Sequence, residues 1–189
     1  MIQKIDFAKY VILYHYGGIY IDMDVRCLKN ISSLKKKFEG NEMIVSNSSS
    51  GIPYKWCNII TKLLFDFVVE MDYVNNGIIL VKKNHKFLLY LCDEISKRLP
   101  RYKYNYLTRD PYVWVSTGPG IVTRCIMDYK LRNNKSNIKI IDGKYLEPCN
   151  GNIPSTNLDE VKKLCDLSES YFIHIHERSW LGVGNVYVW

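Results

Sequence analysis

Apolar residues near the start of the chain recur at the spacing of an α-helix and then run together as a short strand. Residues 5–16 are predicted to form the helix, and five apolar positions share one of its faces: Ile5, Ala8, Val11, Ile12 and Tyr16. Gly17-Gly18 ends this helix, and Ile19–Ile21 follows as a buried strand. The strand leads into Asp22-Met23-Asp24, so we expect a helix, a tight turn, a strand and an acidic loop in that order.

The rest of the chain alternates between short apolar runs and longer amphipathic stretches. Further strands are predicted at residues 43–46, 77–82, 138–141 and 171–175. Further helices are predicted at residues 56–67, 87–99, 121–129 and 158–164. Two segments, residues 47–51 and the tyrosine-rich residues 101–112, are predicted as loops. Alternating strands and helices predict a single α/β domain over residues 1–189, with a mixed central sheet.

Length and composition narrow the class of protein. The chain has 189 residues, of which 47% are hydrophobic, so it is too apolar for a disordered segment and has the length of one domain. It contains no run of about 18 to 20 consecutive apolar residues, which a membrane-spanning helix needs. No basic segment followed by an apolar stretch stands at its start, so no secretory signal is predicted. We therefore expect a soluble globular domain, and a cytoplasmic location is favoured.

The formal net charge of +7 suggests a polyanionic partner only weakly. Nucleic-acid sites usually gather their cations on one face, whereas the lysines here are spread along the chain apart from Lys35-Lys36-Lys37. A solvated basic surface is the preferred interpretation, and no nucleic-acid partner is expected.

The six cysteines lie far apart in the sequence and include no Cys-x-x-Cys pair: Cys27, Cys57, Cys92, Cys125, Cys149 and Cys165. Such spacing does not predict a zinc or redox site. A chain of this length does not need disulfides for stability, so free, mostly buried thiols are expected, in a reducing compartment.

Asp22 and Asp24 stand two residues apart directly after a predicted strand. Two carboxylates in this arrangement can meet one ion if the chain turns there, and they suit Mg²⁺ or Mn²⁺ that also contacts a diphosphate. The spacing alone is weak evidence, since a solvated turn has the same sequence. The position at the carboxyl end of a strand favours a ligand site, because open α/β sheets bind ligands there.

Four motifs then follow one another in a recognisable order. The first is residues 6–25, DFAKYVILYHYGGIYIDMDV, and the second begins at Asn76-Gly77. The third is Thr117-Gly118-Pro119, which also resembles a helix start with Pro119 in the first turn. The fourth combines Tyr171–His174 with Ser179-Trp180. Together they resemble the DxD-containing glycosyltransferases of family 32, which include initiation-specific α-1,6-mannosyltransferases, inositolphosphoceramide mannosyltransferases and capsular polysaccharide sugar transferases.

The resemblance implies a GT-A fold, which is Rossmann-like, and a metal-dependent sugar transfer with retention at the anomeric carbon. The donor would be a GDP- or UDP-sugar, the acceptor a glycan, a lipid or another molecule, and the cofactor Mn²⁺ or Mg²⁺. The catalytic DxD region would cover residues 5–30, and the acceptor-side and C-terminal region residues 70–189. The implied catalytic residues are Asp22, Asp24 and Asn76. The implied substrate-binding residues are Asp6, Lys9, Tyr10, Gly18, Thr117, Gly118, Pro119, His174 and Trp180.

The resemblance also implies individual roles. Asp24, Asp22 and His174 would be metal ligands, with Asp22 reaching the ion through its water shell or contacting the donor ribose. Asp6 and Lys9 would lie near the donor sugar, Asn76 near the sugar or the metal, and His174 and Trp180 over the diphosphate. Structural alternatives remain open for several of these residues. His174 suits a core position, Asn76 a turn, Thr117-Gly118-Pro119 a helix cap, and Trp180 the core.

The sequence departs from the family pattern at three places. Lys9 replaces an arginine and Lys86 replaces a proline that usually follows the histidine of the second motif. Only five residues precede Asp6, whereas the family places the first strands of the nucleotide-binding half there. An N-terminally truncated domain is therefore expected, and the alternative function is a non-catalytic remnant or one half of a split enzyme. Its exposed sheet edge would pair with a partner chain or with a second copy.

Overall fold

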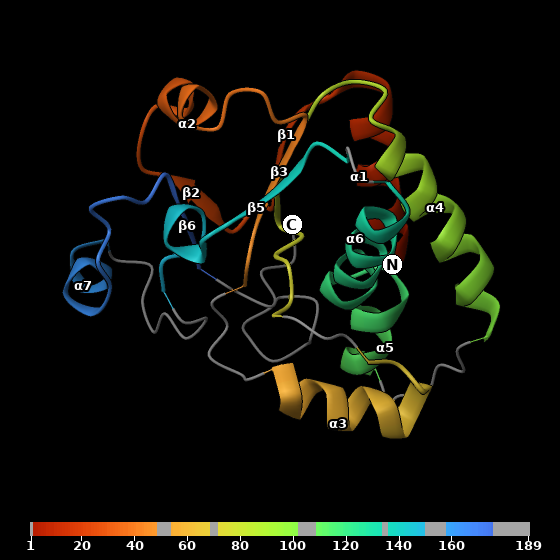
Figure 1. Ribbon diagram of the computed structural model, residues 1–189. Helices are drawn as coiled ribbons and strands as arrows, with labels where there is room; N and C mark the ends of the chain where they lie inside the picture. Colours follow the sequence, from red (N-terminus) through yellow and green to blue (C-terminus); the bar gives the residue numbers. More distant parts are fainter. Residues whose placement is uncertain are drawn as a thin grey trace, which may run out of the picture.

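The computed structural model describes residues 2–48, 54–68, 72–101, 109–133, 136–149 and 158–175 (Figure 1). The elements are α1 (Ile2–Tyr16), β1 (Gly18–Ile21), β2 (Val25–Cys27), α2 (Ile31–Lys37), β3 (Met43–Ser46), α3 (Tyr54–Phe65), β4 (Ile78–Val81), α4 (Lys86–Arg98), η1 (Leu99–Arg101), α5 (Arg109–Ser116), α6 (Pro119–Arg132), β5 (Ile138–Ile141), η3 (Gly143–Tyr145), α7 (Leu158–Leu164) and β6 (Phe172–His174). The alternation of helices and strands confirms the predicted α/β class.

The main sheet has the strand order β1-β4-β3-β5 and mixed strand directions, as predicted. Strand β4 is antiparallel to both of its neighbours, and β3 runs parallel to β5. The two central strands, β3 and β4, are buried at every position, which explains their continuous apolar sequences. Among the described strands β1 forms one edge of this sheet, with Gly18 and Ile21 exposed. Strands β2 and β6 form a separate two-stranded sheet.

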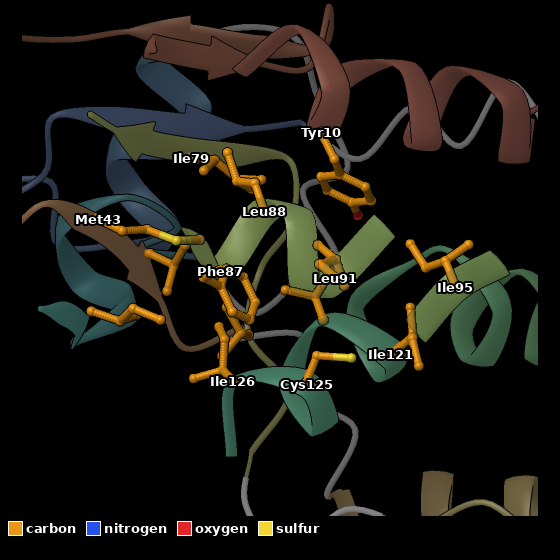
Figure 2. Close-up of a cluster of buried hydrophobic side chains, with 14 of the residues drawn as sticks. Tyr10, Met43, Ile79, Phe87, Leu88, Leu91, Ile95, Ile121, Cys125 and Ile126 are labelled. Carbon is orange, nitrogen blue, oxygen red and sulfur yellow. The ribbon is translucent and has the colours of Figure 1, made fainter. Parts of the chain in front are cut away.

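Helices cover one face of the main sheet and form the larger core with it. Figure 2 shows the apolar side of α4 between the sheet and α6. Phe87, Leu91 and Ile95 recur every four residues on α4 and are almost fully buried. These side chains pack with residues of the two flanking layers: Met43 and Ile79 of the sheet, and Ile121, Cys125 and Ile126 of α6.

The opposite face of the sheet carries a second, smaller core. Ile44, Ile78 and Leu80 point to this side, because successive side chains of a strand alternate between the two faces. They pack with Leu34 of α2 and Phe172 of β6. The small β2-β6 sheet is thereby held against the main sheet, next to the end of β1.

The apolar face of α1 is mostly exposed and does not pack against the core. Ile5, Ile12 and Tyr16 are 48%, 56% and 78% exposed, and Ala8 is exposed as well, while Val11 is half-buried. The helix instead buries Asp6, Lys9, Tyr10 and Leu13. The apolar periodicity failed here because two charged side chains form a buried pair that the sequence pattern does not show.

The Gly17-Gly18 turn forms as predicted. Both glycines have positive φ values, 64° and 104°, which other residues rarely adopt. A Cβ atom at Gly17 would lie 2.5 Å from the backbone nitrogen of Lys83. The turn therefore lets β1 begin directly beside the end of β4.

The prediction of a loop over residues 101–112 is wrong at its C-terminal end. Residues 109–116 form α5, whose Tyr112 and Val113 are buried. Short helices gain their stability from packing rather than from sequence propensity, so this one has little local signal. Tyr102, Tyr104 and Tyr106 lie outside the described residues.

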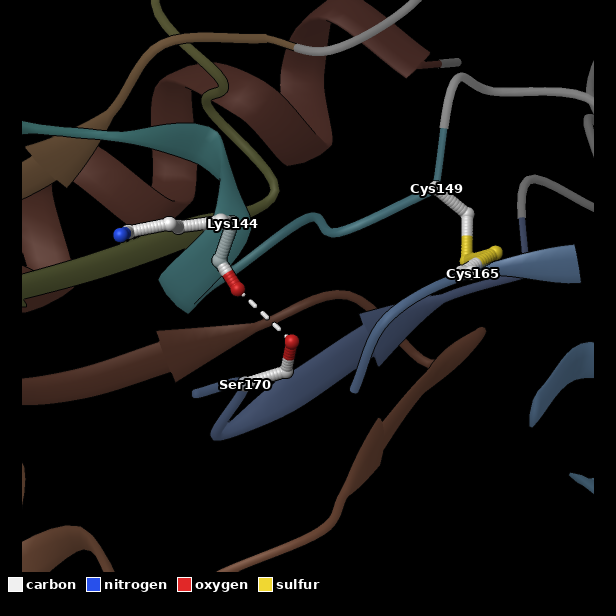
Figure 3. The surroundings of a disulfide bond; sticks show 4 residues. All are labelled: Lys144, Cys149, Cys165 and Ser170. Carbon is white, nitrogen blue, oxygen red and sulfur yellow. Dashed lines mark hydrogen bonds between the residues drawn. A yellow bond between two sulfur atoms is a disulfide. The ribbon is translucent and has the colours of Figure 1, made fainter. Parts of the chain in front are cut away.

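Two cysteines contradict the expectation of free, mostly buried thiols. Cys149 and Cys165 form a disulfide across 16 residues of sequence, with their Cα atoms 5.5 Å apart (Figure 3). Nearby, the Ser170 hydroxyl donates to the Lys144 carbonyl oxygen at 2.7 Å. Cys92 and Cys125 keep free thiols inside or partly inside the protein, whereas the free thiol of Cys27 is exposed. The pairing depends on a tertiary contact, which spacing in the sequence does not show.

Along the described residues, none of the helices combines the length and the apolar character that crossing a bilayer requires.

Candidate functional site

A tight turn after β1 brings Asp22 and Asp24 together. The Asp22 amide donates to the Gly77 carbonyl oxygen at 2.8 Å, and the Val25 amide donates to the Asp22 carbonyl oxygen at 3.1 Å. Met23, at the tip of this turn, is fully exposed, whereas both aspartates are half-buried. The turn therefore directs its apolar side chain to solvent and keeps its two carboxylates close to the protein.

His174 joins the two aspartates through the pairing of β2 with β6. Val25 lies opposite His174 in this register, so the imidazole reaches the residue just before Val25. Its Nε2 atom lies 3.1 Å from Oδ1 of Asp24. Asp22, Asp24 and His174 each offer one ligand atom, and these atoms lie within 4.8 Å of one another. In the described part of the chain this is the only such group of three potential metal ligands.

Burial and charge act against each other in this cluster. Burial raises the pKa of Asp22 above its ordinary value, although Lys9, the Tyr20 hydroxyl and His174 favour the ionised form. Burial lowers the pKa of His174, but the hydrogen bond to Asp24 and the charges of Asp24, Glu147 and Asp22 together leave it raised. Both shifts favour a bound proton, so these groups lie in a partly desolvated place where added positive charge is stabilised.

The backbone of Gly77 passes directly beside the side chains of Asp22 and His174. A Cβ atom there would be 2.6 Å from Oδ2 of Asp22 and 3.1 Å from Cε1 of His174. The position therefore leaves no room for any side chain. The second motif of the sequence contains this glycine, but within that motif only its neighbour Asn76 was predicted to have a functional role.

Two residues that the sequence analysis missed hold Gly77 in place. Oδ1 of Asn75 accepts from the Gly77 amide at 2.6 Å, and Nδ2 of Asn75 donates to Oε2 of Glu147 at 2.8 Å. Asn75 and Glu147 are 5% and 1% exposed. Asn75 could have been singled out in the sequence, because it is a polar residue just before an apolar strand. The sequence around Glu147 gives no comparable indication of a site.

Predicted substrate-binding residues form a second, connected network. Asp6 pairs with Lys9, with 2.7 Å between Oδ1 and Nζ, and its Oδ2 accepts from the Thr117 hydroxyl at 2.9 Å. The Tyr10 hydroxyl donates to the Thr117 carbonyl oxygen at 2.7 Å and accepts from Nδ2 of Asn76 at 3.1 Å. The structure therefore brings together five of the predicted site residues from α1, the start of α6 and the entrance to β4.

Tyr20 connects this network to the aspartate pair. Its hydroxyl donates to Oδ1 of Asp22 at 2.7 Å, and the Lys9 ammonium lies 4.9 Å from the centre of its ring. Burial and the nearby carboxylates raise the pKa of Tyr20 well above its ordinary value, so the hydroxyl keeps its proton and remains a donor. Tyr20 was not among the predicted site residues.

The remaining predicted site residues belong to a helix start or an edge strand, or they lie outside the described part of the chain. Gly118 and Pro119 begin α6, and a Cβ atom at Gly118 would lie 3.0 Å from the Val113 carbonyl oxygen. Gly18 is an exposed residue of the edge strand β1. Trp180 lies outside the described residues, and its predicted role stays a prediction.

Comparison with known proteins gives one family match and several relatives. Residues 1–49 match the family described as glycosyltransferase sugar-binding region containing DXD motif. Over 94% of its length the chain is 31% identical to the uncharacterized glycosyltransferase L373 of Acanthamoeba polyphaga mimivirus, of which it covers 57%. Over its full length it is 26% identical to inositol phosphoceramide mannosyltransferase 1 of Schizosaccharomyces pombe, of which it covers 44%. The chain therefore spans about half the length of these curated relatives.

Proposed function

Because this chain is related to the glycosyltransferases that contain a DXD motif, we propose that it transfers a sugar from a nucleotide sugar to an acceptor. The observation that carries the proposal is the convergence of Asp22, Asp24 and His174 within 4.8 Å at the DXD turn. We propose that these three side chains hold a divalent cation, and that the GDP- or UDP-sugar binds beside it.

The donor atoms of this cluster fit Mn²⁺ or Mg²⁺. Two carboxylates supply hard oxygen ligands, and three protein ligands leave further positions for diphosphate oxygens or water. The imidazole favours Mn²⁺ over the harder Mg²⁺. When bound, the cation would neutralise the negative charge that gathers on the departing nucleoside diphosphate.

The chain's own residues would orient the donor. Tyr20 fixes Asp22 through one carboxylate oxygen, and Asn75 fixes the backbone that passes beside the other. The buried pair of Asp6 and Lys9 would form the wall next to the donor sugar. A preorganised set of charges of this kind stabilises developing charge without reorganising during the reaction.

The proposed transfer breaks the bond between the anomeric carbon and the diphosphate oxygen and forms a bond to an acceptor oxygen. The diphosphate keeps the bonding electrons, and the proton of the acceptor hydroxyl passes to the departing diphosphate oxygen or to water. Retention at the anomeric carbon follows from the family resemblance and belongs to the proposal. The name of inositol phosphoceramide mannosyltransferase 1 suggests mannose as the sugar and an inositol phosphoceramide lipid as one acceptor to examine.

Nucleotide-sugar hydrolysis tests the proposed function. We expect a donor among a panel of GDP- and UDP-sugars to be hydrolysed in the presence of Mn²⁺, and chelation to abolish turnover. Asp24→Asn should lower the rate by about a hundredfold or more, because it removes a charged ligand. Asp93→Asn changes a surface carboxylate that pairs with Lys97 on α4, and it should leave the rate unchanged. Absence of both donor binding and turnover across the panel would refute the proposal.

A further inference from the structure

The outward face of helix α3 is apolar. Ile59 and Ile60 are each 51% exposed, Leu63 is 79% exposed and Leu64 is 45% exposed. Residues four apart lie above one another on a helix, so these side chains form two adjacent rows on one side of α3. Val68, which is 43% exposed, follows shortly after the end of the helix.

The inward face of the same helix combines polar side chains with Phe65, which packs against the larger core. Thr61 is 1% exposed, and its hydroxyl donates to the Phe67 carbonyl oxygen at 2.7 Å. Oδ1 of Asn58 accepts from the Tyr73 hydroxyl at 3.5 Å. A helix at the surface of a globular protein normally directs its apolar stripe to the core. On α3 four large aliphatic side chains face solvent instead, and a contiguous exposed apolar patch of this kind marks an interaction surface.

A basic hollow of about 690 Å³ opens beside this face. Leu63 and Leu64 contribute to its lining, and so do four cationic side chains: Lys62, Arg98, Arg101 and Arg124. Lys62 pairs with Asp66, and Arg98 pairs with Glu94 at 2.9 Å. Four positive and two negative side chains leave an excess of two positive charges around the hollow.

Figure 1 shows α3 at the lower edge of the molecule, below α5 and on the far side from α1 and α2. In this view no described helix or strand lies beyond α3. The exposure of Ile59, Ile60, Leu63 and Leu64 agrees with that position.

We propose that this surface, the outward face of α3 with the basic hollow, binds a bilayer that contains anionic lipids. The aliphatic side chains would enter the boundary between headgroups and acyl chains, as in amphipathic helices that lie in the plane of a membrane. The arginines would contact lipid phosphates, for which the guanidinium group is well suited. Charge complementarity favours this partner over a second copy, because self-association through this face would bring two positively charged hollows together.

Vesicle sedimentation tests this proposal on the full chain. We expect the protein to bind phosphatidylcholine vesicles that contain phosphatidylserine about tenfold more tightly than vesicles of phosphatidylcholine alone. Added salt should weaken the preference. The double variant Leu63→Glu with Leu64→Glu should lower binding about tenfold or more. The double variant Arg101→Glu with Arg124→Glu should remove the preference for anionic vesicles.

Two control variants change matched residues elsewhere on the surface. Leu131→Glu alters a leucine of α6 that is 82% exposed, and Lys36→Glu alters an exposed lysine of α2. Both should bind vesicles like the unmodified chain. Three results would overturn the proposal: no vesicle binding, equal binding by the α3 variants and the unmodified chain, or a vesicle-independent dimer that Leu63→Glu with Leu64→Glu dissociates. Binding of an acidic polypeptide such as polyglutamate without vesicle binding would also overturn it.

Discussion

Gly77 occupies the point where β4 passes the aspartate pair, and its lack of a side chain is a requirement of the site. In Gly77→Ala the added Cβ would lie 2.6 Å from Oδ2 of Asp22, a distance at which one of the two groups must move. We expect the affinity for Mn²⁺ to fall about tenfold or more, because ligands must be held close to their productive geometry. Calorimetric titration of Mn²⁺ measures this affinity.

Gly120→Ala is the matched control for that prediction. Its Cβ would lie 2.8 Å from the Trp114 carbonyl oxygen, which belongs to the junction of α5 and α6 rather than to the site. This variant should lower stability and leave the Mn²⁺ affinity of the folded protein unchanged. Equal losses of affinity in the two variants would show that Gly77 acts on general stability.

Lys9 and Asp6 form a charge pair that is almost fully buried, at 4% and 6% exposure. In Lys9→Met the Asp6 carboxylate would remain buried without its cation. Breaking a buried pair in this way costs about 3–5 kcal/mol of unfolding free energy. Urea unfolding of the variant measures the loss.

The double variant Lys9→Met with Asp6→Asn removes both charges and should recover much of that stability. If the pair serves the donor sugar as proposed, the double variant regains stability while nucleotide-sugar hydrolysis stays impaired. Recovery of hydrolysis together with stability would show that the pair is needed only for folding.

At the scale of secondary-structure elements, α4 begins on a histidine that acts as its cap. Nδ1 of His85 accepts from the Phe87 amide at 3.3 Å, and His85 is 5% exposed. Burial lowers the pKa of His85, although Glu42 and a backbone contact at Ser136 oppose this shift. Lys86 occupies the first helical position, where proline is also common, so the departure from the family pattern leaves the start of the helix intact.

The lowered pKa of His85 predicts a loss of stability in mild acid. The folded protein favours the neutral imidazole, because only the neutral ring can accept from Phe87. The stabilisation is therefore complete above the pKa of an unfolded histidine, about 6.5. It should decrease as the pH falls below that value toward the lower pKa of the folded state.

His85→Asn isolates this contribution, since asparagine also caps helices and does not titrate. We expect the unfolding free energy of the unmodified chain to fall more steeply between pH 7 and about pH 5 than that of the variant. Parallel curves for the two proteins would contradict a titrating cap at α4.

At the scale of the whole molecule, the order of helices and strands followed from the sequence because most elements have clear periodicity. Strands β3 and β4 are short continuous apolar runs, and α4 has a regular apolar stripe. The buried face of α1 could not be predicted from apolar periodicity, because the helix buries the charged residues Asp6 and Lys9. The disulfide between Cys149 and Cys165 likewise depends on contacts between distant segments.

The candidate site was predictable to the extent that it resembles a known motif. Asp22, Asp24 and His174 could be named from the motif order, and the pairing of β2 with β6 explains why they meet. Asn75, Glu147 and Tyr20 act by holding the backbone or a neighbouring side chain. Such supporting contacts arise only when the chain is folded, so periodicity and motif spacing do not reveal them.

The proposed divalent-cation site consists of Asp22, Asp24 and His174. Calorimetric titration of Mn²⁺ into the unmodified chain, Asp24→Asn and His174→Ala, each in the presence of GDP or UDP, tests this most directly. We expect one site per chain, with the affinity for Mn²⁺ lowered about tenfold or more in both variants. Equal Mn²⁺ affinity in all three proteins, or no binding to the folded unmodified chain, would contradict it.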